Sequence, residues 1–141
     1  MRVLVIVKAN EESEAGVLPD PKIFEEMGKF NEELLKAGVM LSAEGLQPSS
    51  KGVRVKFTGK NPSVIDGPFP ETKELIAGFW LWKVKSLEDA VNWIKRSPFQ
   101  DTAIEIRPLY EMEDFSGIVS PELLEDEKRQ RAEAEKLSKS A

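Results

Sequence analysis

The sequence contains no cysteine and no histidine. Without cysteine, the chain forms no disulfide and has neither a thiolate nucleophile nor the usual ligands of an iron–sulfur cluster. Without histidine, it lacks the usual acid/base of neutral pH and the commonest protein ligand for transition metals. Any proton transfer must therefore use carboxylates, lysine, Tyr110 or water. We expect no metal site and no cofactor.

The sequence also lacks a basic surface and a long apolar run. The formal net charge is -5 and the isoelectric point is near 5.0, which argues against nucleic acid as a partner. Anionic membrane surfaces are disfavoured for the same reason. The opening apolar run, residues 3–7, ends before Lys8 and is too short for a signal peptide or a membrane span. We expect a cytoplasmic protein.

The length of 141 residues, with 40% hydrophobic and 32% charged residues, is typical of one soluble domain. Beyond Gly117 the composition shifts, because residues 121–139 are rich in Glu, Lys, Arg and Ala. Such a segment forms a charged helix or a frayed tail rather than a second core. We therefore predict a domain over residues 1–115 and a charged C-terminal tail over residues 116–141.

Apolar patterns predict the elements of that domain. Residues 2–8, 39–46, 76–85 and 103–109 are predicted strands, and residues 53–57 and 64–65 are the two arms of a hairpin. Asp20 and Ser86 are predicted to cap two helices, and Gly38 follows the end of the first one. Pro108 indicates that the last strand lies at an edge of the sheet.

The order of these elements is strand, helix, strand, hairpin, strand, helix, strand. Right-handed crossovers place both helices on one face of a single sheet, in a ferredoxin-like α+β fold. In this arrangement the first strand and the strand before the second helix lie side by side in the centre. Those two strands carry apolar residues on both faces.

The second face of the sheet therefore needs a cover. In the first strand, Val3, Val5 and Val7 alternate with Leu4 and Ile6; in the other, Trp80 and Trp82 alternate with Phe79 and Leu81. Whichever set faces the helices, the opposite set is exposed to water in a lone chain. We predict a homodimer in which two sheets pack face to face. The alternative is that the hairpin or the charged tail covers this face.

Several short motifs resemble one protein family. They are GLQPSS (residues 45–50), VIDGPFPETKE (64–74), the following IAGFW, and SLEDAVNWIKRSPF (86–99). Together they resemble the DGPF branch of the YCII-related proteins, from the first strand to about Leu109 and weakly on to EDFSG (113–117). The resemblance implies a dimeric α+β barrel. It implies no settled activity, and the His–Asp pair of the founding type has no counterpart in a chain without histidine.

The DGPF segment allows two interpretations. Asp66, Gly67 and Pro68 favour a tight turn, so the segment can be a rigid corner with Phe69 as a plug into the core. The functional hypothesis is that the corner directs Asp66 into a cleft, where it acts as a general base or as a substrate anchor.

The charged residues around this corner are further candidates. Glu71 and Glu74 could divide acid and base roles or hold a cation such as Mg²⁺; the alternative is a solvated loop. Lys73 could hold an anionic ligand. Glu44 is a third catalytic candidate, facing either water or a pocket.

Two uncharged residues complete the predicted site. Ser49 lies in the loop after the second strand and is a predicted ligand-binding residue. Trp80 either packs in the core or dimer interface, or lines an apolar ligand cavity. The predicted catalytic residues are thus Asp66, Glu44 and Glu71, and the predicted ligand-binding residues are Ser49, Lys73, Glu74 and Trp80.

Three functions stay open at this point. The chain could be a cofactor-independent enzyme acting on a small molecule. It could be a ligand-binding or regulatory module, since the resemblance implies a partner among extracytoplasmic-function sigma factors. It could also be a dimerisation unit without a pocket. We favour a small-molecule-binding or enzymatic homodimer of unidentified substrate.

Overall fold

The computed structural model describes residues 1–140, which fall into two units, residues 1–109 and residues 110–140. The first unit contains β1 (Arg2–Lys8), α1 (Glu11–Glu14), α2 (Pro21–Lys36), β2 (Met40–Gly45), the 3₁₀ turn η1 (Ser49–Lys51), β3 (Val53–Lys56), β4 (Ser63–Asp66), β5 (Ile76–Lys83), α3 (Leu87–Ile94) and β6 (Ile104–Pro108). The second unit contains the 3₁₀ turn η2 (Met112–Phe115) and α4 (Pro121–Ser140). The sequence patterns predicted every element except α1, η1 and η2.

The two helices of the first unit begin at the predicted caps. The Asp20 carboxylate accepts hydrogen bonds from the Lys22 and Ile23 amides at 2.8 and 3.1 Å, which satisfies two of the free amides at the start of α2. Gly38, with φ at +71°, follows the end of that helix. At α3, the Ser86 hydroxyl accepts from the Asp89 amide at 3.1 Å. Capping residues therefore fix the starts of both crossover helices and the end of α2.

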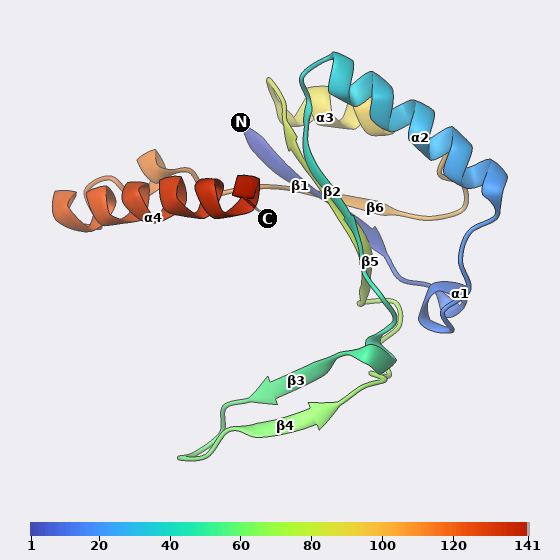
Figure 1. The fold of residues 1–141 in the computed structure, drawn as a ribbon, viewed down its shortest axis with the longest axis horizontal. Helices are drawn as coiled ribbons and strands as arrows, with labels where there is room; N and C mark the ends of the chain where they lie inside the picture. Colours follow the sequence, from blue (N-terminus) through green and yellow to red (C-terminus); the bar gives the residue numbers. More distant parts are fainter. Residues whose placement is uncertain (141) are drawn as a thin grey trace. The chain divides into compact units, whose positions relative to one another are not determined.

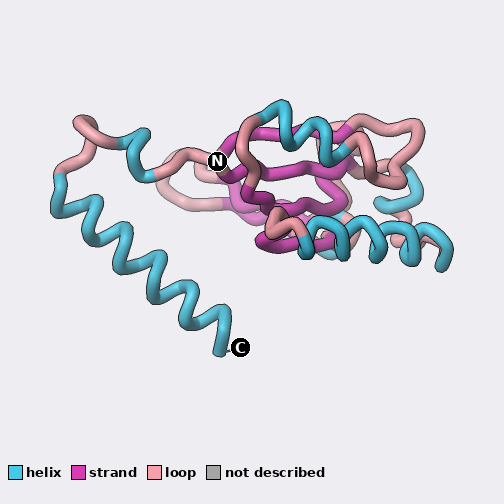
Figure 2. The backbone as a smooth tube through the Cα atoms, turned by 90° about the horizontal axis from the view of Figure 1, so that it is seen from above, coloured by secondary structure: helices cyan, strands magenta, loops and turns pink. Residues whose placement is uncertain are grey.

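The four long strands form one antiparallel sheet in the order β2-β5-β1-β6. This is the ferredoxin-like order, and β1 and β5 are the central pair, as predicted. β6 is an edge strand, which agrees with Pro108 at its end. Figure 1 shows α2 and α3 on the same side of this sheet, and Figure 2 shows them from above, running along the strands. The predicted α+β fold is confirmed.

The core lies between the two helices and one face of the sheet. It contains Val3, Val5, Phe30, Leu34, Val39, Trp80, Trp82, Val84 and Ala90. The register pairs Val5 with Trp80 and Val3 with Trp82, so the valines and tryptophans share the face that the helices cover. The Phe30 ring meets Trp80 edge to face, with centroids 6.0 Å apart and planes at 85°. Aromatic packing thus holds α2 on the sheet.

The opposite face of the sheet is also apolar at its centre. Leu4 pairs with Leu81 and Ile6 pairs with Phe79 across the two central strands. Leu4, Leu81 and Phe79 are half-buried in the single chain, and Ile6 is buried. We call these four residues the open-face cluster. The predicted alternation is confirmed.

The hairpin formed by β3 and β4 makes a separate two-stranded sheet. All residues of both strands are exposed, including Val53 at 58%. Figure 1 shows the hairpin extending away from the four-stranded sheet. Within the described chain the hairpin therefore stands in solvent, and it does not pack on the core.

The second unit consists of a short turn and a charged helix. In α4, Arg129 pairs with Glu133 at 3.1 Å and Arg131 pairs with Glu127 at 3.0 Å. These i,i+4 pairs support an exposed helix with few apolar residues. The prediction of a charged C-terminal helix is confirmed. Over residues 1–140, no helix combines the length and the apolar character that crossing a membrane requires.

Candidate functional site

A cavity of about 640 Å³ lies between the first half of α2 and the end of the sheet where β2 and β5 pair. Side chains from three parts of the fold surround it: Phe24, Met27 and Asn31 of α2, Ala43 and Trp80 of the sheet, and Phe99 after α3. The wall is mostly apolar and rich in aromatic rings. Cavities of this size and character accept small organic molecules.

The cavity exists because the first half of α2 does not pack tightly on the sheet. The spacing of Ile23, Met27, Phe30 and Leu34 predicted one buried stripe along the whole helix. The structure buries Phe30 and Leu34, but Ile23 is 46% exposed and Phe24 is 58% exposed. The prediction of a continuous buried stripe is therefore wrong for the first turn, where Ile23 is exposed and Phe24 borders the cavity.

The connection between α1 and α2 forms another part of the wall. Val17, Leu18 and Pro19 border the cavity, and Leu18 is 79% exposed. Gly16, which has φ at +78°, turns this segment beside Pro48. Exposed apolar side chains gathered at the rim of an apolar cavity are typical of a binding site.

Asn31 and Glu44, two of the polar residues at the cavity, differ in their placement. The Trp80 indole Nε1–H donates a hydrogen bond to Asn31 Oδ1 at 2.9 Å, so this amide is fixed in the wall. Glu44 borders the cavity as well. However, Glu44 pairs with Phe79, whereas Ala43 pairs with Trp80. Because side chains alternate along a strand, the Glu44 side chain belongs to the face opposite to Trp80.

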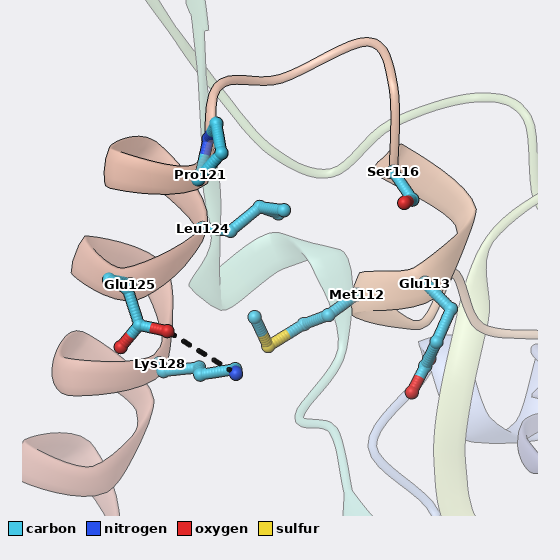
Figure 3. A pocket seen from close by; sticks show the side chains of 7 residues that line it. All are labelled: Met112, Glu113, Ser116, Pro121, Leu124, Glu125 and Lys128. Atoms are coloured by element: carbon cyan, nitrogen blue, oxygen red, sulfur yellow. Dashed lines mark hydrogen bonds and ion pairs between the residues drawn. The ribbon is translucent and has the colours of Figure 1, made fainter.

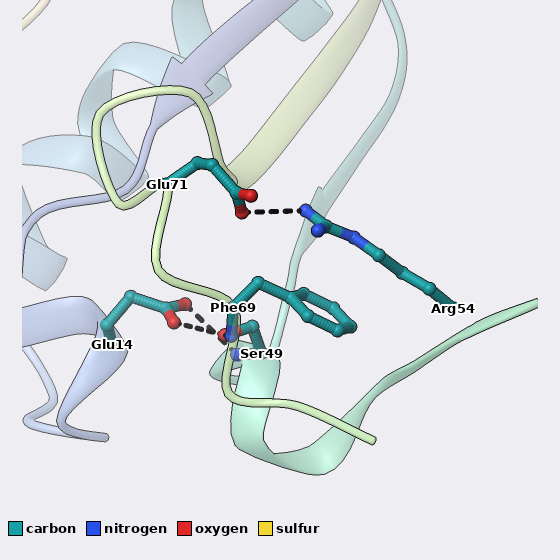
Figure 4. Close-up of polar contacts among 5 residues, drawn as sticks. All are labelled: Glu14, Ser49, Arg54, Phe69 and Glu71. Carbon is teal, nitrogen blue, oxygen red and sulfur yellow. Dashed lines mark hydrogen bonds and ion pairs between the residues drawn. The ribbon is translucent and has the colours of Figure 1, made fainter. Parts of the chain in front are cut away.

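The DGPF segment forms a corner that is held by Ser49. The Ser49 hydroxyl accepts a hydrogen bond from the Phe69 amide at 3.0 Å and donates one to the Glu14 carboxylate (Figure 4). The Gly67 amide donates to the Gly52 carbonyl at 3.0 Å, and the Gly67–Pro68 peptide is cis. These hydrogen bonds hold the corner in place.

Phe69 does not enter the core. Its ring is half-buried and lies under the Arg54 guanidinium, 3.8 Å from the ring centroid. This geometry is a cation–π contact. The expected plug into the core is therefore wrong, because the residue packs against the hairpin strand β3.

Arg54 also pairs with Glu71, at 3.1 Å between Nη2 and Oε2 (Figure 4). The hydrogen bond from Arg54 lowers the pKa of Glu71 below its ordinary value of 4.5. The Glu71 carbonyl accepts from the Glu74 amide at 2.8 Å in a turn, and Lys73 and Glu74 are exposed. No group of three or more acidic side chains in residues 1–140 is arranged to hold a metal ion.

The predicted site residues therefore fall into two places. Trp80 lines the cavity and Glu44 borders it. The other five belong to the corner and its surroundings: Ser49, Asp66, Glu71, Lys73 and Glu74. Their catalytic and binding roles stay predictions.

Sequence reasoning did not find Asn31, Phe24 or Phe99 as cavity residues. Asn31 lies one turn after Met27 on the face of α2 that meets the sheet. An amide among apolar residues on the inner face of a helix was the available signal.

A smaller hollow of about 270 Å³ lies within the second unit, between η2 and the start of α4. Figure 3 shows the Met112 and Leu124 side chains in this hollow, with Lys128 paired to Glu125. Its one basic side chain is thus already engaged. The aromatic-lined cavity of the first unit is the stronger candidate site.

Comparison with known proteins decides the family. The sequence profile of the YCII-related domain matches residues 1–113. The chain belongs to the YCII-related family. The matched range of this YCII-related protein includes the whole sheet, both crossover helices and the cavity.

Two known proteins are similar to this YCII-related protein to different degrees. An uncharacterized protein of Rhizobium meliloti (strain 1021) is 26% identical over 93 residues, which are 64% of this chain and 75% of that protein. A solved structure, the 5-chloro-2-hydroxyhydroquinone dehydrochlorinase TftG from Burkholderia phenoliruptrix AC1100 in complex with 2,5-dihydroxybenzoquinone, is 13% identical. That similarity covers 79% of this chain and 95% of the other, with a TM-score of 0.45. Proteins this distant need not share an activity.

Proposed function

We propose that this YCII-related protein binds a small organic molecule in the cavity between α2 and the sheet, as a homodimer. The observation that carries the proposal is the aromatic-lined cavity of about 640 Å³ with the Asn31 amide fixed in its wall. Binding sites for small molecules combine an apolar wall with few, well-placed polar groups. The cavity has both features.

The rim of the cavity supports the proposal. Leu18, Phe24 and Leu46 border the cavity and are each more than half exposed. Exposed apolar side chains lose unfavourable contact with water when a ligand covers them. A ligand would thus bury surface that the folded chain by itself leaves in solvent.

Two chemical roles fit this site. In the enzymatic version, a carboxylate performs acid/base catalysis, because the chain has no histidine or cysteine for this role. This version uses no cofactor. Of the predicted catalytic residues only Glu44 borders the cavity, but its side chain belongs to the opposite face of β2, so this version lacks a predicted carboxylate on the cavity face. In the binding version, the cavity holds a ligand without turnover. Both versions require the same cavity to be occupied.

The homodimer is proposed from the open-face cluster. Leu4, Phe79 and Leu81 present apolar surface on the face that α2 and α3 leave uncovered. A second sheet is a self-complementary cover, because a two-fold axis brings the same cluster from both chains together. We therefore propose face-to-face packing of two sheets, as in a dimeric α+β barrel.

The cavity is tested with N-phenyl-1-naphthylamine, an uncharged fluorophore that brightens in apolar surroundings. We expect its fluorescence to rise with the native protein. Ala43→Phe places a ring in the cavity wall, and we expect that variant to lose most of the signal while its circular dichroism is unchanged.

The matched control is Ala134→Phe, which makes the same change on the exposed side of α4. We expect this variant to bind the fluorophore as the native protein does. If the native protein gives no signal, or if both variants bind equally well, the proposed site is wrong.

A further inference from the structure

The hydrogen bond between Trp80 and Asn31 determines which polar atoms Asn31 offers to the cavity. An indole N–H can only donate, so the Asn31 atom at 2.9 Å from Trp80 Nε1 must be the amide oxygen. The amide nitrogen, Nδ2, then carries its two hydrogens away from that bond. Asn31 therefore presents its two N–H donors, and one lone pair of its oxygen is already used.

The surrounding rings hold this amide in place. Trp80 is 5% exposed, and its ring meets Phe30 and Phe99 edge to face, with centroids 6.0 and 5.9 Å away. Its indole cannot turn without disturbing the core, so the partner oxygen of Asn31 is fixed as well. A donor fixed in advance loses little freedom when it binds a ligand.

The cavity has no cationic side chain in its wall. Among the described residues that surround it there is no lysine or arginine, and the one charged residue, Glu44, belongs to the opposite face of its strand. An anionic ligand would lose its hydration here without gaining an ion pair. A cationic ligand would lose its hydration without gaining a carboxylate partner on this face, because Glu44 belongs to the opposite one.

We propose that the ligand is an uncharged, mainly apolar molecule with a single hydrogen-bond acceptor, such as a carbonyl oxygen next to a ring. The acceptor receives a hydrogen bond from Asn31 Nδ2, and the apolar body lies among Phe24, Met27, Trp80 and Phe99. This inference rests on the proposed function, because it names the chemical class of ligand for the same cavity.

Four naphthalene compounds of similar shape test the inference by isothermal titration calorimetry. 2-Acetylnaphthalene is uncharged with an acceptor, 2-ethylnaphthalene is uncharged without one, 2-naphthoate is an anion, and 1-(2-naphthyl)ethylammonium is a cation. We expect the acetyl compound to bind about tenfold more tightly than the ethyl compound, as one hydrogen bond of ordinary strength predicts. We expect both ions to bind more weakly than either uncharged compound.

Asn31→Asp is the matching variant. A carboxylate still accepts the Trp80 hydrogen bond but cannot donate one to the ligand. The variant should therefore bind the acetyl compound and the ethyl compound about equally tightly. Asn61→Asp makes the same change of charge in the turn of the exposed hairpin, and we expect it to keep the tenfold preference. The ranking of the four compounds is measured on the native protein, so it tests the inference even if a variant does not fold.

The outcomes separate the two proposals. If none of the four compounds binds, the proposed function fails and the inference fails with it. If they bind but the naphthoate or the ammonium binds as tightly as the acetyl compound, only the inference on ligand class is overturned. A tenfold preference that survives in Asn31→Asp would also overturn it, because Asn31 would not be the donor.

Discussion

Ser49 donates a hydrogen bond to the carboxylate of Glu14, which lies 35 positions earlier in the chain. The second carboxylate oxygen of Glu14 accepts from the Ser49 amide at 3.0 Å, and the Ser49 hydroxyl accepts from the Phe69 amide at the same distance. One serine thus connects α1 to the DGPF corner. The contact also joins two segments that border the cavity, since Ser13 precedes Glu14 and Pro48 precedes Ser49.

Replacing Ser49 by alanine should destabilise the protein by about 1–3 kcal/mol, because the half-buried Glu14 carboxylate loses one of its two hydrogen bonds from residue 49 and the Phe69 amide loses its acceptor. Chemical denaturation of the two proteins measures this difference. Ser50→Ala, the same change at an exposed neighbour, should alter the free energy of unfolding by less than about 0.5 kcal/mol. Equal effects of the two substitutions would show that the Ser49 contacts contribute nothing.

Gly67→Ala should be destabilising by about 1–3 kcal/mol, as is usual for overpacking. A Cβ atom at this position would overlap the carbonyl oxygen of Ser49 and lie 2.6 Å from its carbonyl carbon. Gly28→Ala is the control, because a Cβ there meets nothing within 4 Å in the middle of α2. That change should stabilise the protein by about 0.5–1 kcal/mol. Thermal unfolding of both variants tests the opposite signs.

Arg54→Gln should raise the pKa of Glu71 toward its ordinary value of 4.5, since the guanidinium hydrogen bond that lowers it is lost. A lowered pKa means that the pair contributes stability above pH 4.5 and loses it as the pH falls through the pKa of the folded state. An NMR titration of the Glu71 carboxyl carbon measures the change. Lys56→Gln removes the same charge from the same strand and should leave the Glu71 titration unchanged.

Leu81→Lys should convert a dimer into a monomer, because it places a charge at the centre of the open-face cluster, where two sheets are proposed to meet. Light scattering after size exclusion should give twice the chain mass of 15.8 kDa for the native protein and 15.8 kDa for the variant. Leu123→Lys, the same substitution at an exposed position of α4, should remain dimeric. A native protein that is monomeric at high concentration would contradict the proposed interface.

The ferredoxin-like sheet could be predicted because each of its elements carries a local pattern. Valines alternate in β1, tryptophans alternate in β5, and Asp20 and Ser86 mark the starts of α2 and α3. These signals depend on neighbouring residues only. The short α1 was missed because its capping box, Asn10 with Ser13, begins a helix of a single turn without an apolar stripe.

The candidate site was harder to predict than the fold. The charged residues around Asp66 were predicted as a site because they are close together in the sequence. The cavity, however, is lined by Phe24, Asn31 and Phe99, which lie far apart in the chain. Their association depends on how α2 and the segment after α3 meet the sheet. The spacing of residues within one helix or strand does not predict a contact between such distant segments.

The sequence by itself determined the element order, the two-sided apolar sheet and the absence of cysteine and histidine, because periodicity and composition are local properties of the chain. Only the tertiary structure decided that the first turn of α2 stands over a cavity and that Trp80 fixes the Asn31 amide. It also decided that Ser49 links Glu14 to the DGPF corner. These relationships join residues distant in sequence, and packing in three dimensions alone brings them together.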